Sequence, residues 1–226
     1  MTSTSRHSSF ATVALGASAV FIALVALLHG VKPELEPSWR MVSEYSIGEN
    51  GWLMRVAFLT LSVSFGSVLI SVRPHIATLG GRVGLALLGV ATLGTLMAAL
   101  FAADPITAEP DEVTAEGSLH AVASLLGLPT LPIAALLISG SLKRNPMWAD
   151  QIAGVRWAAH LTWLTLLAMV ATLFATVPAA GGFGPEVPIG WQNRIVLAAY
   201  TFWVVVVAWQ ARRVELAAGA RYATSR

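Results

Sequence analysis

Six long apolar segments alternate with shorter polar segments along this chain of 226 residues. An α-helix rises about 1.5 Å per residue, so about 20 residues cross a hydrocarbon core that is about 30 Å thick. The apolar segments of that length are residues 10–29, 52–72, 83–103, 119–141, 157–177 and 194–211. The pattern therefore predicts an all-α protein, a bundle of six transmembrane helices.

The segment ends agree with this division. The first apolar run, from Phe10 to Leu28, is longer than a signal-peptide core and lacks a small-residue cleavage site, so we expect it to remain as a membrane helix. Helix-breaking pairs such as Gly181-Gly182 fall between the runs. Pro129 and Pro132 lie inside the fourth run, where we expect a kink and not a break. We therefore expect a tail of residues 1–9, a membrane domain of residues 10–212 and a tail of residues 213–226.

The composition excludes several classes of protein. Apolar residues make up 56% of the chain and charged residues 12%, against about 25% charged in a soluble domain. The absence of cysteine excludes disulfides, iron–sulfur clusters and thiolate zinc sites. No basic patch with interleaved aromatic residues indicates nucleic-acid binding. Haem is not expected, because His29 and His120 are the only outer histidine pair that could lie at matched depth.

The few charges are sorted by side. When both termini are placed in the cytoplasm, that side holds ten of the 14 basic residues and two of the 12 acidic residues, a net charge of +8. The basic residues on that side are Arg6, Arg73, Arg82, Lys143, Arg144, Arg156, Arg212, Arg213, Arg221 and Arg226. The other side has a net charge of −6. The positive-inside rule therefore predicts cytoplasmic termini, and the Arg-rich, Ala-rich composition indicates a bacterial plasma membrane as the location.

Polar residues gather at the predicted outer ends of the helices, where ionisable groups are costly and are default functional candidates. His29 ends the first span, Glu44 and Tyr45 lie in the first outer loop, Asp104 ends the third span, His120 begins the fourth, and Gln192 and Arg194 begin the sixth. A GWxxR sequence with Trp52 and Arg55 recurs with Trp191 and Arg194. These Trp side chains suit the lipid interface, and the Arg side chains either snorkel or anchor an anionic head group.

Two chemistries fit this set. His29, Glu44, Asp104 and His120 carry the nitrogen and carboxylate ligands that zinc and similar divalent metals take. Glu44, Asp104 and His120 could instead perform acid–base catalysis. The structural alternative is that both histidines are interfacial helix ends and that Asp104 caps a turn.

Helical spacing predicts different environments for His120 and His160. Gly117, His120, Ser124 and Gly127 share one helical face, which directs His120 into the bundle. His160, which shares a face with Leu164 and Leu167, is interpreted as structural.

The same residues resemble a family of bacterial and archaeal membrane proteins known as domain of unknown function 998. The resemblance rests on Ser43-Glu44-Tyr45, Gly48, Gly51-Trp52-Leu53-Met54, His29, Asp104-Pro105, Thr114, Gly117, His120, Gln192 and Arg194, and it spans residues 10 to 212. It implies a six-helix membrane fold, and it favours His29, Glu44, Asp104 and His120 acting as a set. One departure is Asn193, which separates Gln192 from Arg194 where a contiguous pair is expected.

Three functions follow from these observations. The first is a membrane-embedded enzyme, hydrolytic or acid–base, that acts on a lipid-like or isoprenoid substrate. In that reading Glu44, Asp104 and His120 are catalytic, and Tyr45, Trp52, Arg55, Gln192 and Arg194 bind substrate. The second is a non-catalytic sensor or accessory subunit that binds a lipid or small ligand. The third is a transporter, which the absence of Asp and Glu from the span centres disfavours.

Overall fold

The structure, a computed structural model, describes residues 3–224 and the side chains of residues 9–218. The α-helices are α1 (Ser3–Val31), α2 (Gly51–Val72), α3 (Leu79–Leu100), α4 (Ala115–Gly127), α5 (Thr130–Leu142), α6 (Ile152–Ala180) and α7 (Ile189–Thr224). Three short 3₁₀ helices are η1 (Val42–Ser46), η2 (Arg73–His75) and η3 (Pro146–Trp148). All regular secondary structure among the described residues is thus helical.

Six helical segments are long and apolar enough to cross a membrane, as the sequence predicts. They are Ser9–Val31, Gly51–His75, Leu79–Leu100, Ala115–Leu142, Ile152–Ala180 and Ile189–Ala218. The protein is therefore a multi-pass membrane protein with six candidate spans. α1 and α7 extend into the tails expected at residues 1–9 and 213–226.

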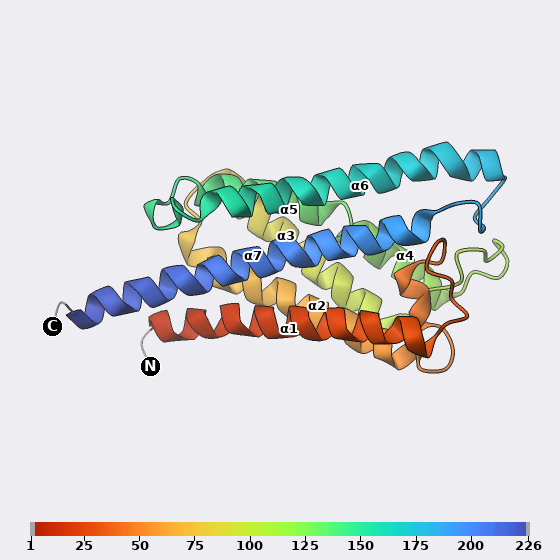
Figure 1. Ribbon diagram of the computed structural model, residues 1–226, viewed down its shortest axis with the longest axis horizontal. Coiled ribbons are helices and arrows are strands. Elements are labelled where there is room, and N and C mark those ends of the chain that lie inside the picture. Colours follow the sequence, from red (N-terminus) through yellow and green to blue (C-terminus); the bar gives the residue numbers. More distant parts are fainter. Residues whose placement is uncertain (1–2, 225–226) are drawn as a thin grey trace.

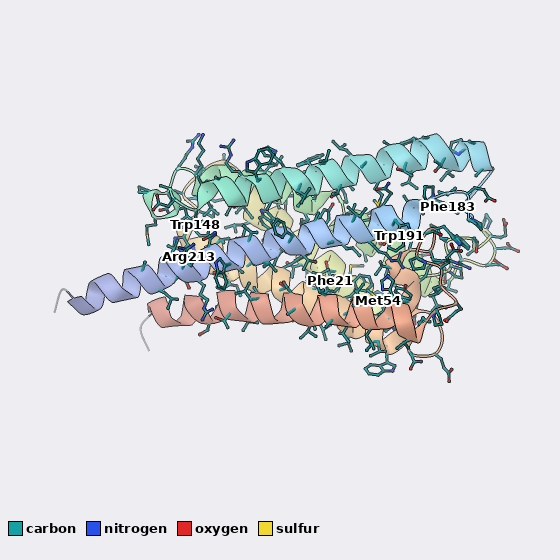
Figure 2. The ribbon with its side chains drawn as sticks, in the orientation of Figure 1. Phe21, Met54, Trp148, Phe183, Trp191 and Arg213 are labelled. Atoms are coloured by element: carbon teal, nitrogen blue, oxygen red, sulfur yellow. The ribbon has the colours of Figure 1, made fainter. Side chains whose placement is uncertain are left out.

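The helices form a closed ring in which chain neighbours pack side by side. α1 packs on α2, α2 on α3, α3 on α4 and α5, α5 on α6, and α6 on α7, while α7 returns to α1. Figure 1 shows α1 and α7 side by side, with both termini at one end of the bundle. The opposite end, which holds the loops from residues 32–50, 101–114 and 181–188, is termed the distal end. Figure 2 places Trp191 and Phe183 at the distal end, and Trp148 and Arg213 towards the termini.

The fourth span is interrupted at Leu128 and Pro129, which separate α4 from α5. Both residues keep right-handed helical dihedral angles, so the expected kink takes the form of a local loss of helical hydrogen bonding. Pro132 cannot donate to the carbonyl oxygen of Leu128, and the hydroxyl of Tyr200 on α7 donates to that oxygen at 2.5 Å. The hydroxyl of Thr130 likewise donates to the carbonyl of Leu126. Side chains thus replace the missing backbone donors, which makes the interruption tolerable inside a membrane.

The third helix begins and ends earlier in the sequence than predicted. It ends at Leu100, and Phe101 is already extended, with φ −114° and ψ 129°. The amide of Ala103 donates to the hydroxyl of Ser46 at 3.1 Å, so this segment bonds to a neighbouring loop and not to its own helix. The expectation that Asp104 ends the third span is therefore wrong, because Asp104 lies in the distal loop.

The orientation prediction can be tested directly in a chain without cysteine. The charge distribution predicts that Asp111 in a distal loop faces outward and that Ala149, in the loop between α5 and α6, faces the cytoplasm. Both residues are exposed. Arg6 and Arg221, which contribute to this prediction, have side chains outside the described set, and Arg226 lies outside the described residues.

A membrane-impermeant maleimide added to intact cells is expected to label an Asp111→Cys variant, whereas Ala149→Cys reacts only after the cells are opened. Labelling of Ala149→Cys in intact cells, with Asp111→Cys protected, would contradict the predicted orientation.

Candidate functional site

Arg194 connects several segments of the distal end through hydrogen bonds. It lies in the second turn of α7, and its Nε atom donates to His29 Nε2 on α1 at 2.8 Å. One terminal nitrogen donates to the carbonyl oxygens of Pro37, Arg40 and Gly190 at 3.2, 2.7 and 3.0 Å. The other donates to the Tyr45 hydroxyl at 2.9 Å. The described residues place no carboxylate within ion-pair distance of this guanidinium, so neutral acceptors from four segments satisfy the charge.

The hydrogen bonds of His29 show which of its two ring nitrogens carries the proton. The Nδ1 atom of His29 bonds to the carbonyl oxygen of Val25 at 2.7 Å, which makes Nδ1 the protonated nitrogen. Nε2 therefore accepts the hydrogen bond from Arg194, and both ring nitrogens are occupied. The ring also makes an edge contact with Tyr45, with 5.3 Å between ring centroids. His29 consequently has no lone pair left for a metal ion.

Glu44 joins two distal loops. It is 1% exposed, and its carboxylate accepts hydrogen bonds from Arg40 Nη1 at 2.8 Å, from the amide of Met41 at 2.7 Å and from the amide of Ile106 at 3.0 Å. The Arg40 contact is also an ion pair. A buried carboxylate is stable only with such partners. Glu44 therefore attaches the loop before α4 to the 3₁₀ helix η1.

Asp104 closes the loop that precedes α4. Its carboxylate accepts from the amide and the hydroxyl of Thr114, both at 2.8 Å. Thr114 in turn caps α4, since its hydroxyl accepts from the amide of Gly117 at 2.9 Å. A Cβ atom on Gly117 would lie 1.9 Å from Asp104 Oδ2, so only glycine fits beside this carboxylate. Asp104 therefore positions the residue that caps α4.

His120 differs from these residues because it faces a cavity. Its Nδ1 atom bonds to the carbonyl oxygen of Phe101 at 2.9 Å, and among the described residues no partner bonds Nε2. The side chain is 5% exposed and its ring lies 5.8 Å from that of Phe58. The predicted face of α4 is confirmed here, because His120, Ser124 and Gly127 line the cavity together.

The cavity is an apolar space with a few polar groups. Its lining comes from α2, α3, α4, α7 and η1, and the apolar part includes Phe58, Leu61, Phe65 and Leu197. Its volume is about 70 Å³, room for about two water molecules or a small polar head. The close approach of α3 and α4 at one wall requires Gly94, whose added Cβ would lie 2.8 Å from the carbonyl oxygen of Ala123.

The cavity lining includes five partly exposed residues. Ser43 lies on η1, Ser124 and Gly127 on α4, Leu128 directly after α4, and Leu197 on α7. All of them except Ser43 belong to candidate membrane spans.

Asn193 is a cavity residue that the sequence analysis did not select. Its Oδ1 atom accepts from the amide of Val42 at 3.0 Å, which leaves the Nδ2 donors without a partner among the described residues. It is 8% exposed and lines the cavity together with Ser43 and Tyr200. The signal in the sequence was that Asn193 separates Gln192 from Arg194, where the family resemblance leads us to expect a contiguous pair.

The remaining predicted substrate-binding residues lie away from the cavity. Trp52 is 62% exposed at the start of α2. Arg55 forms an exposed ion pair with Glu116 at 2.9 Å. Gln192 is half-buried and has no side-chain partner among the described residues. Tyr45 and Arg194 bond to each other in the distal network.

The predicted metal set does not converge. Within the part of the chain that the structure describes, no three His, Asp or Glu side chains lie close enough together to hold a metal ion. The cause is visible in the contacts, since Glu44, Asp104 and His29 direct their lone pairs at donors of the protein itself. The residues present therefore do not fit a zinc site.

The network around Arg194 makes a quantitative prediction. Arg194→Gln removes the donors of at least four acceptors, and each acceptor left without a partner costs about 1–3 kcal/mol. We expect the free energy of unfolding to fall by more than about 2 kcal/mol, measured by denaturation in detergent.

Arg55→Gln is the matched control, because an exposed ion pair contributes at most about 1 kcal/mol. Arg194→Lys is expected to recover little, since an ammonium cannot reproduce the planar arrangement of donors. Equal stability of Arg194→Gln and Arg55→Gln would contradict the structural role of Arg194.

Comparison with known proteins identifies a family for this chain. Residues 15–210 match the model of a family described as Protein of unknown function (DUF998). No curated protein and no solved structure matches the chain. The match includes the distal network and the whole cavity lining, so the chain belongs to the DUF998 family of membrane proteins.

Proposed function

We propose that this protein binds a neutral, lipid-like amphiphile in the cavity between α4 and α7. The observation that carries the proposal is that His120 Nε2 lies at an apolar cavity, and four partly exposed residues of its lining belong to candidate membrane spans. A head group that carries a hydroxyl can donate to Nε2 and accept from the Nδ2 group of Asn193. Long-chain and isoprenoid alcohols have this chemistry.

The lining also supports a neutral ligand over a charged one. No Lys, Arg, Asp or Glu is among the described residues around the cavity. A charged head group would therefore lose its hydration without gaining a counterion, which is unfavourable in an apolar site. The cavity volume of about 70 Å³ accepts the small head group alone, and the tail extends past Ser124 and Leu197 into lipid.

Binding without catalysis is the simpler reading because the predicted catalytic carboxylates are engaged elsewhere. Glu44 holds backbone amides and Arg40, and Asp104 holds Thr114. Neither lines the cavity. A role as a lipid-binding sensor or accessory subunit therefore accounts for the geometry with the fewest additional groups.

An acid–base enzyme at the same position is the second candidate, and His120 favours it. A histidine whose Nδ1 is fixed by a carbonyl and whose Nε2 faces the ligand has the arrangement of a general base. In this version Nε2 removes the proton of the bound hydroxyl as its oxygen attacks the carbonyl carbon of an ester. The bond from that carbon to the leaving alcohol then breaks, and the leaving alcohol takes the proton back from Nε2. The two candidates differ in whether the bound alcohol is consumed.

The test uses a long-chain alcohol with a nitroxide on its tail, and the fraction immobilised by purified protein in nanodiscs gives Kd. His120→Ala removes one hydrogen bond to the head group and is expected to weaken binding about tenfold. His120→Gln keeps an acceptor in the side chain and is expected to weaken binding less.

Leu125→Ala is the control, because Leu125 is on the same helix, is 72% exposed and does not line the cavity. The corresponding fatty acid is expected to bind more weakly than the alcohol when its carboxylate is ionised. Equal affinity of the wild type and His120→Ala, or preference for the fatty acid, would contradict the proposal. Consumption of the alcohol by the wild type but not by His120→Gln would decide for the enzyme.

A further inference from the structure

A second hollow lies at the opposite end of the bundle, near the termini, and it is basic. This groove of about 220 Å³ runs between α5 and α6 and is lined by Leu136, Ser139, Gly140, Lys143, Arg156 and His160. Lys143 follows the last residue of α5, and Arg156 and His160 lie in the first turns of α6. Two adjacent helices thus direct three nitrogen-bearing side chains to one groove.

None of these three nitrogen-bearing side chains has a side-chain partner among the described residues. Lys143, Arg156 and His160 are exposed, and among the described residues they form no ion pair or side-chain hydrogen bond. The connecting segment from Arg144 to Gln151 contributes one further cation, Arg144, and one carboxylate, Asp150. Asp150 pairs with neither Lys143 nor Arg156. The groove therefore has net positive charge without an internal counterion.

The groove changes from polar to apolar with depth. Arg156, His160 and Leu164 follow at intervals of four residues, so they lie on one face of α6, about 6 Å apart along the helix axis. Leu164 is 65% exposed and Leu167 is 56% exposed, and both continue this face towards the membrane centre. On α5, Gly140 is exposed and a Cβ atom there would meet nothing within 4 Å, which leaves the groove wall open.

We infer that this groove binds the phosphate of an anionic phospholipid from the leaflet at the terminal end of the bundle. The phosphate lies between Lys143 and Arg156, His160 donates to the phosphate or to an ester carbonyl, and the acyl chains follow Leu136 and Leu164. This order matches the order of groups in a phospholipid. Lys or Arg residues that merely snorkel do not require a groove.

The charge balance favours an anionic lipid over a zwitterionic one. A phosphatidylcholine head would bring a quaternary ammonium group beside Arg156 and Lys143, whereas phosphatidylglycerol adds only hydroxyls. If the termini are cytoplasmic, as predicted, the groove opens to the leaflet where juxtamembrane cations meet anionic lipids. The inference gives His160 a ligand-binding role in place of the structural one expected from the sequence, and it is independent of the cavity at His120.

The experiment measures thermal stability and bound lipid for detergent-purified full-length protein, titrated with phosphatidylglycerol, phosphatidylcholine or inorganic phosphate. The test variant is Lys143→Gln/Arg156→Gln/His160→Gln. The control variant is Arg73→Gln/Arg82→Gln/Arg213→Gln, which removes exposed cations at the same end of the bundle but outside the groove.

Phosphatidylglycerol is expected to raise the melting temperature of the wild type and of the control, and phosphatidylcholine is not. The test variant is expected to bind phosphatidylglycerol about 25-fold more weakly, about fivefold for each Lys or Arg removed. If the triple variant does not fold, Arg156→Gln alone is compared with Arg156→Lys, and only the glutamine variant is expected to lose binding.

Two further outcomes would contradict the inference, one by showing that the ligand is free phosphate and the other by showing that the groove is not the binding site. A rise in melting temperature with inorganic phosphate at the same concentration would identify free phosphate as the ligand and overturn the lipid assignment. Equal stabilisation of all three proteins by phosphatidylglycerol, or stabilisation by phosphatidylcholine to the same extent, would overturn the site.

Discussion

A guanidinium at the boundary of a membrane needs an acceptor for its N–H groups, and the distal end of this protein is organised by that requirement. Arg194 finds its acceptors on α1, on the segment from Pro37 to Arg40, on Tyr45 of η1 and on its own helix. Each acceptor is neutral, so the network depends on the position of every segment at once. The ends of α1 and α7 and the first distal loop are consequently fixed relative to one another.

The contacts at the distal end also determine the shape of the cavity. With η1 in place, Val42 donates to Asn193, Glu44 receives the amide of Ile106, and the segment after α3 presents the Phe101 carbonyl to His120. These contacts lie on the distal side of the cavity between α4 and α7. The polar residues at the distal end thus divide into a large structural group and a small group that faces the cavity, in which His120 and Asn193 offer complementary hydrogen-bonding atoms.

The sequence predicted what depends on local composition and helical period. The six spans follow from hydropathy, the kink from Pro129 and Pro132, and the inward face of His120 from its spacing with Ser124. It did not predict pairings that depend on the paths of loops. Arg194 and His29 are 165 residues apart, and Asn193 and Val42 are 151 apart. Glu44 and Asp104 resembled metal ligands because a sequence does not reveal which amides will surround a carboxylate.

The distal polar residues were divided above into a structural group and a group that faces the cavity. The most direct test of that division is an experimental structure of the protein in lipid nanodiscs that contain a long-chain alcohol. The account predicts elongated non-protein density in the cavity, with its head within about 3.2 Å of His120 Nε2. It also predicts that Glu44 and Asp104 remain bonded to Ile106 and Thr114. A metal ion held by Glu44, Asp104 and a histidine, with the alcohol absent from the cavity, would contradict it.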